Sequence, residues 1–164
     1  MLQISHTSYS ISDFIEWHGL KKLVLTPKFQ RRDVWSAKAK SYLIDTVLKG
    51  MPIPPIFIRM TLEPKTGRGI REVVDGQQRI KAILSYASDE FSVLSVHSPI
   101  YGGMVFSDLP EEVQKSFYTY SFVVHQFSDV DDSTVLEVFS RLNTYTVALN
   151  TQELRNANYS GLFK

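Results

Sequence analysis

The sequence of 164 residues contains no cysteine. This absence excludes disulfide scaffolds, thiolate zinc sites, iron–sulfur clusters and cysteine nucleophiles. No stretch approaches the roughly 18 consecutive apolar residues that a membrane helix needs, and the N-terminus has no basic segment followed by an apolar run. We therefore expect a protein of the reducing cytoplasm that does not associate with membranes.

Several familiar motifs are also missing. The sequence has no P-loop, no G-x-G-x-x-G fingerprint, no G-x-S-x-G elbow and no kinase signature. Its four histidines lack the spacing of metal ligands, which favours structural or surface roles for them: His6, His18, His97 and His125. There is no internal repeat and no low-complexity tract. Any function must therefore come from a compact site.

The composition is that of a packed globular protein. The chain is 43% hydrophobic, 21% charged and 12% aromatic, which is unlike a disordered segment. A domain near this length buries roughly 68–70% of its unfolded surface. We expect a single domain over residues 1–164 that is the N-terminal fragment of a longer protein. The apolar Leu162 and Phe163 at its end favour a homodimer unless they dock elsewhere.

The apolar periodicity alternates between strand and helix. It predicts helices at 10–18, 37–49, 77–86, from about 110, at 132–142 and from 150, and strands at 22–25, 56–60, 70–74, 91–96 and 120–127. Five strands interleaved with helices predict a mixed α/β, or α+β, domain. We expect a small mixed sheet flanked by helices, with a helical extension at the C-terminus.

Charge is distributed unevenly along the chain. Residues 1–82 carry 14 Lys and Arg against 7 Asp and Glu, whereas residues 83–164 carry 4 against 10. Such a basic half could face an anionic ligand, although the two halves could equally neutralise each other across the fold. If the ligand is DNA, the basic stretch Lys21–Lys49 supplies the contacts, and the residues predicted to make them are Lys28, Arg32, Lys38 and Lys40.

The strongest local signal is the segment from Val73 to Ile80, in which an apolar strand meets a polar cluster and then a helix. A helix N-terminus has unpaired N–H groups and favours phosphate. Within the segment, Gly76 would let a ligand approach the backbone, and Arg79 offers a charged fork. Asp75 would be repelled by phosphate unless it binds a divalent metal, orients a water, or accepts hydrogen bonds from sugar hydroxyls or Arg79. The alternative is that Asp75 only caps the helix.

Two further clusters are less specific. Arg31 and Arg32 lie between Phe29 and Trp35, a mixture of charge and aromatic rings that nucleic-acid and nucleotide sites often use, although the rings could simply be core. The segment 139–144 ends a predicted helix. There Arg141 would interact favourably with the negative end of the helix dipole, and Asn143 would be an ordinary C-cap residue. By itself this segment therefore indicates little about function.

Taken together, these clusters resemble the N-terminal domain of the GmrSD family of modification-dependent (Type IV) restriction enzymes, a branch of the ParB/sulfiredoxin-like superfamily. The likeness extends over about residues 22–157. It rests on four motifs: Phe29-Gln30-Arg31 followed by Trp35; Gly50-Met51-Pro52-Ile53-Pro54; Asp75-Gly76-Gln77-Gln78-Arg79; and Phe139-Ser140-Arg141-Leu142-Asn143 followed by Leu149 and Glu153-Leu154.

The resemblance implies a domain that binds and hydrolyses a nucleoside triphosphate (NTP) with Mg²⁺ and regulates a DNA-restriction system. Asp75 would be catalytic and hold the metal, with Gln77 as the second catalytic residue. The implied nucleotide-binding residues are Gln30, Arg31, Gly76, Gln78, Arg79, Arg141 and Asn143. The implied partners are DNA and an HNH-type nuclease domain. Since the 164 residues contain no His-Asn-His pattern, the nuclease would lie elsewhere in the same chain or in another chain.

Two alternatives remain open at this stage. One is a ParB-like DNA-binding module that senses modified DNA. The other is an inactive protein-interaction domain, in which the motif residues only brace the fold.

Overall fold

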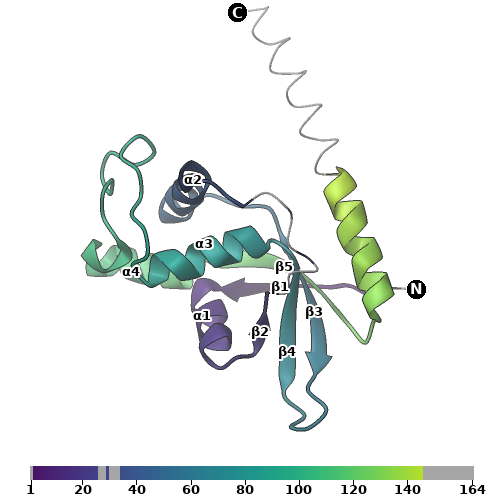
Figure 1. The fold of residues 1–164 in the computed structure, drawn as a ribbon. Helices are drawn as coiled ribbons and strands as arrows, with labels where there is room; N and C mark the ends of the chain where they lie inside the picture. Colours follow the sequence, from purple (N-terminus) through teal and green to yellow (C-terminus); the bar gives the residue numbers. More distant parts are fainter. Residues whose placement is uncertain (1, 26–28, 30–33, 146–164) are drawn as a thin grey trace, which may run out of the picture. The chain divides into compact units, whose positions relative to one another are not determined.

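The computed structural model describes residues 2–25, 29 and 34–145. They belong to two compact units, Met1–Asp129 and Val130–Lys164, and each is described by itself. The first unit combines a five-stranded sheet with helices, which confirms the predicted mixed α/β class. Figure 1 shows its helices gathered at one side of strands β3 and β4, whose connecting turn projects away from them.

The sheet is mixed, as predicted. Its strands lie in the order β1-β5-β3-β4-β2, with bounds Ser5–Ser10, Ser121–Ser128, Ile56–Leu62, Gly69–Asp75 and Leu23–Val24. The pairs β1/β5 and β3/β4 are antiparallel, whereas β3/β5 and β2/β4 are parallel. Four of the five strands were predicted. The edge strand β1 was missed because its sequence, SHTSYS, has no apolar alternation.

The helices of the first unit are α1, α2, α3 and α4, with bounds Ile11–Gly19, Ala37–Leu48, Gln77–Ala87 and Glu111–Thr119. The first two of them begin at polar caps. A short 3₁₀ helix, η2, covers Phe106–Asp108. Ser10 and Asp13 form a capping box at the start of α1, and the Ser36 hydroxyl accepts a hydrogen bond from Ala39 N at 3.2 Å at the start of α2.

One face of the sheet packs against these helices to form the core. Ile58, Val73 and Val124 from the strands belong to the same buried cluster as side chains from all four helices. Tyr86 of α3 is fully buried, and its hydroxyl donates to the Met104 carbonyl at 3.3 Å. Burial, helped by two nearby aspartates, raises the pKa of Tyr86 to about 12, so this hydroxyl stays a donor at neutral pH.

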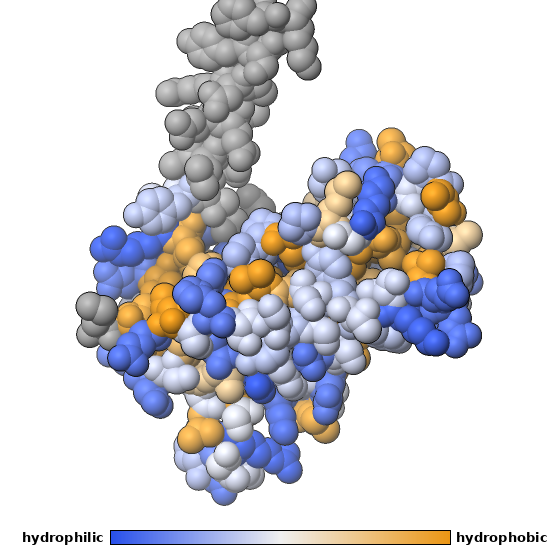
Figure 2. All heavy atoms as spheres, turned by 180° about the vertical axis from the view of Figure 1, so that it is seen from behind, coloured by the Kyte–Doolittle hydropathy of each residue, from blue (hydrophilic) through white to orange (hydrophobic). Residues whose placement is uncertain are grey.

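The strand predicted at 91–96 is wrong. Residues 91–105 form an irregular, turn-rich segment that bonds to itself, because Gly103 N donates to Val93 O at 2.7 Å. The segment is held on α2 by Ser41, whose buried hydroxyl accepts from Leu94 N at 2.8 Å. Of its two valines at 93 and 96, Val93 enters the core, whereas Val96 stays exposed. Figure 2 shows hydrophobic side chains on the outside of this projecting part, at upper right.

Two histidines face each other across β1 and β5. His6 is directly opposite His125, their Nδ1 atoms are hydrogen-bonded, and the rings meet edge to face with centroids 4.5 Å apart. Burial, and to a smaller extent the charge of His6, lowers the pKa of His125 from its usual 6.5. The folded state therefore favours the neutral ring of His125.

We expect this pair to make stability depend on pH. Since the pKa of His125 is lower in the folded state, its contribution is present above about pH 6.5 and is lost as the pH falls below that value. The variant His125→Gln should lose less stability than the wild type between pH 7 and pH 5 in urea unfolding. His18→Gln, outside the pair, is the control and should follow the wild type. If the free energy of unfolding fell equally with pH in His125→Gln and in the wild type, this assignment would be contradicted.

The second unit begins with a helix over residues 132–145. Its start is capped by Asp131, whose Oδ1 accepts from Thr134 N at 2.8 Å. The predicted helix at 132–142 is confirmed, but Asn143 lies inside the helix and is not a C-cap. Several predicted features lie outside the described residues. They are the helix from residue 150, Leu149 and Glu153-Leu154 of the fourth motif, and the apolar end at 162–163. Among the described helices, none has the length and apolar character to cross a membrane.

Candidate functional site

The motif turn joins the end of β4 to the start of α3. Asp75 is the last residue of the strand, and Gly76 is the N-cap of the helix, with φ +103° and ψ 13°. A Cβ on Gly76 would lie 2.5 Å from Cδ1 of Ile56, so both the dihedral angle and the space require glycine. The alternative in which Asp75 caps the helix is wrong. Since Gly76 has no side-chain oxygen to accept from the first-turn N–H groups, an anion can take that place.

Arg79 is held firmly beside this turn. Its Nη1 donates to the carbonyl of Pro54, and its Nη2 donates to the carbonyl of Pro55 at 3.2 Å. Nη2 also lies 3.6 Å from Oδ2 of Asp75, and the two side chains are only 12% and 15% exposed. The guanidinium therefore fixes the proline segment before β3 to α3 and places a positive charge next to Asp75.

The two consecutive glutamines have different surroundings. Gln77 is 3% exposed, and its Nε2 donates to the Val73 carbonyl at 3.0 Å, so its side chain helps to hold strand and helix together. Gln78 lines a pocket instead, and its buried Nε2 has no hydrogen-bond partner among the described residues. Of the two amides, that of Gln78 is the one placed to meet a ligand.

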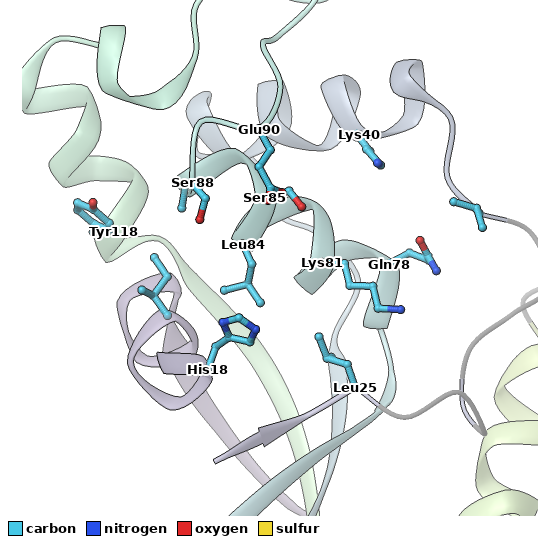
Figure 3. A pocket seen from close by; sticks show the side chains of 13 residues that line it. His18, Leu25, Lys40, Gln78, Lys81, Leu84, Ser85, Ser88, Glu90 and Tyr118 are labelled. Atoms are coloured by element: carbon cyan, nitrogen blue, oxygen red, sulfur yellow. The ribbon is translucent and has the colours of Figure 1, made fainter. Parts of the chain in front are cut away.

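This pocket has a volume of about 560 Å³ and is lined by residues of α1, α2, α3 and α4 and of their connections. Figure 3 shows Lys40, Gln78 and Lys81 at one end of it. At the other end it shows Ser88 and Tyr118, with His18 and Leu84 between the two ends. The pocket therefore has lysines at one end, and aromatic and aliphatic side chains in its middle and at its other end.

Of the four residues predicted to bind DNA, the structure describes Lys38 and Lys40. Lys38 is exposed on α2, whereas Lys40, on the same helix, lines the pocket with its Nζ 6.0 Å from the centre of the Phe91 ring. Four predicted site residues lie outside the described residues: Lys28, Gln30, Arg31 and Arg32. The structure thus places Lys40 with Gln78, a combination that the sequence did not indicate.

The remaining predicted nucleotide-binding residues belong to the second unit. Arg141 is exposed there, and its Nε and Nη2 each lie 3.2 Å from Oε1 of Glu137, one helical turn earlier. Asn143 is half-buried in the same helix. Their predicted contact with a nucleotide stays a prediction.

Of the described residues that line the pocket, sequence reasoning indicated only Lys40 and Gln78, and it missed His18, Lys81 and Tyr118 among others. Lys81 carried a signal, because it follows Gln78 by three positions and therefore shares its helix face. His18 and Tyr118 carried none, since α1 and α4 are about a hundred residues apart in the sequence.

The site offers little of its own to a metal ion. Within the part of the chain that the structure describes, no group of three or more His, Cys, Asp or Glu could hold one. Mg²⁺ is usually bound through one or two carboxylates together with substrate phosphates and waters. A single carboxylate at the turn, Asp75, suits an ion that arrives with a nucleotide, and it does not suit a resident metal cage.

Residues 11–160 match the family described as "GmrSD restriction endonuclease, N-terminal domain". This chain belongs to the GmrSD N-terminal domain family. The match confirms the resemblance and includes all four motifs, the Asp75–Arg79 turn and every residue that lines the pocket. No curated protein and no solved structure matches the chain. The relation of this GmrSD domain to the ParB/sulfiredoxin-like superfamily therefore stays a prediction.

Proposed function

We propose that this GmrSD domain binds an NTP at the start of α3, hydrolyses it, and thereby regulates a DNA-restriction system. The observation that carries the proposal is the Asp75–Gly76–Gln77 turn. It combines a left-handed glycine, first-turn N–H groups without an N-cap oxygen, and a carboxylate beside a fixed arginine. Such a turn suits phosphate oxygens. The family description supports the restriction context.

The proposed roles follow from the contacts at the turn. The amides after Gly76 and the side chain of Gln78 bind phosphate oxygens, while Asp75 accepts a hydrogen bond from the attacking water. Mg²⁺ bound with the nucleotide would neutralise charge on the phosphate oxygens, and Asp75 is the residue that would hold it. Phosphoryl transfer depends mainly on positioning and on charge stabilisation. Arg79 is held by two carbonyls, so its charge is already in place before the reaction.

Restriction also requires a nuclease, and the sequence has no His-Asn-His pattern. We propose that an HNH-type nuclease domain, in the same or another chain, cuts DNA under the control of the nucleotide state of this domain. Gln30, Arg31, Arg141 and Asn143 remain proposed nucleotide ligands, and Gln77 remains a proposed catalytic residue.

The catalytic role of Asp75 is tested by Asp75→Asn. We expect phosphate release from Mg²⁺–NTP to fall by about 10²–10⁴-fold, the usual contribution of a positioned acid–base group, while affinity for the nucleotide measured without Mg²⁺ is kept or improved. An increase in affinity would mean that the negative charge of Asp75 repels the phosphates in the wild type. Asp129→Asn, an exposed aspartate at the end of the first unit, is the matched control. Wild-type turnover by Asp75→Asn would contradict the assignment.

The inactive interaction domain remains the second candidate, because two motif residues do brace the fold. Gln77 holds β4 to α3, and Arg79 holds the proline segment to the same helix. A thermal melt separates the two candidates. Ligand at 100 times its dissociation constant adds about 2.7 kcal/mol to stability, so an NTP-binding domain melts several degrees higher with nucleotide. No shift with any NTP, with or without Mg²⁺, favours the interaction domain.

A further inference from the structure

The pocket beside α3 changes character along the helix. Gln78 lies in the first turn, Lys81 lies one turn further, and Leu84 and Ser85 follow in the next turn. The positive end of the helix dipole is at the N-terminus, on the side of Gln78. Lys40 reaches the same end from α2. The helix and two lysines thus make one end of the pocket attractive to an anion.

The amide of Gln78 gives this end a specific donor. Its Nε2 is buried and has no hydrogen-bond partner among the described residues, although buried donors are normally satisfied. A phosphate oxygen would accept from it. Among the described lining residues, Glu90 is the only carboxylate, and it lies beyond the C-terminal end of α3, away from the first turn. None of these described residues therefore repels an anion beside Gln78.

The rest of the pocket suits a flat, partly apolar group. Leu84 supplies an aliphatic surface, and His18 and Tyr118 supply rings from α1 and α4. Aromatic side chains of this kind stack on nucleobases without strong preference for one base. A volume of about 560 Å³ lies within the range of roughly 300–1,000 Å³ that small-molecule sites occupy.

We infer that the pocket is the nucleotide subsite, with the phosphates at the Lys40, Gln78 and Lys81 end and the nucleoside against His18, Leu84 and Tyr118 in the rest of the pocket. This inference rests on the proposed function and extends it, since it takes the ligand from the turn at Gly76 along one side of α3. It also moves Lys40 from the predicted DNA contacts to the nucleotide.

Binding of Mg²⁺–NTP, measured by titration calorimetry with each of the four nucleotides on the full chain, tests the phosphate end. Lys40→Ala and Lys81→Ala should each weaken binding about 10-fold. Lys38→Ala removes the same charge from the same helix outside the pocket and should leave binding unchanged. The preference for triphosphate over monophosphate should shrink in Lys81→Ala. Equal losses in Lys38→Ala and Lys40→Ala would show a diffuse charge effect, as for DNA, and would overturn the inference.

A bulky substitution tests the middle of the pocket without changing charge. Ser85→Trp fills it and should weaken binding by at least 10-fold, whereas Ser116→Trp on the exposed side of α4 should not. Circular dichroism melts confirm that each variant is folded. Wild-type affinity in Ser85→Trp and Lys40→Ala, with clear binding by the wild type, would overturn this inference and leave the proposed function standing. Absence of binding by the wild-type chain would overturn both.

Discussion

Gly76→Ala is expected to lower the free energy of unfolding by about 2–4 kcal/mol. Part of this loss is the strain of an L-residue at φ +103°, which is of order 1–2 kcal/mol. The rest comes from Ile56, a fully buried strand residue whose Cδ1 would lie 2.5 Å from the new Cβ, since overpacking typically costs about 1–3 kcal/mol. The quantity to measure is the midpoint of urea unfolding at constant slope.

Gly50→Ala is the matched control for this prediction. Gly50 has φ +68°, and no atom lies within 4 Å of its added Cβ, so only the backbone strain of about 1 kcal/mol should remain. A loss in Gly76→Ala no larger than that in Gly50→Ala would show that the turn yields to the new methyl group. The close approach of strand β3 to the turn would then play no part in selecting glycine.

Glu72→Gln is expected to destabilise the first unit by about 3–5 kcal/mol. Glu72 on β4 faces Arg59 on β3, with Nη2 of Arg59 at 2.9 Å from Oε1 and 3.3 Å from Oε2, and the two residues are 8% and 6% exposed. Removing the charge of Glu72 takes from the buried Arg59 the carboxylate on its neighbouring strand, and losing one partner of a buried pair costs much more than the net contribution of the pair. Chemical unfolding of the folded variant measures the difference.

Two comparisons check the cause. Glu111→Gln breaks the exposed Lys115–Glu111 pair, whose atoms are 3.8 Å apart, and should change stability by less than about 1 kcal/mol. The double variant Arg59→Met/Glu72→Leu should regain much of the loss in Glu72→Gln, because apolar side chains of similar size remove both charges together. Similar losses in Glu72→Gln and Glu111→Gln would contradict a buried-charge effect.

The secondary structure was largely predictable because apolar periodicity is a local signal. Strands β3, β4 and β5 and the four helices lie close to their predicted positions. The failures have physical reasons. Strand β1 is stabilised by pairing with β5, which its own polar sequence does not encode, and residues 91–105 bond to themselves and to Ser41 instead of joining the sheet.

The candidate site was predictable only in part. The strand-to-helix junction at Asp75–Arg79 follows from the sequence, and so does the need for glycine within it. The directions of the side chains do not follow, because Gln77 turns into the fold while Gln78, its neighbour, faces the pocket. Whether an amide braces a fold or meets a ligand depends on what packs around it.

The sequence by itself determined the fold class, the family and the turn that carries the motif, since these depend on residues that are adjacent or periodic. Only the tertiary structure decided that Arg79 is held by the carbonyls of Pro54 and Pro55, and that Lys40 shares a pocket with His18 and Tyr118. These contacts join segments tens of residues apart. They exist because the sheet order brings β4 beside β3, and because the helices pack together against one sheet face.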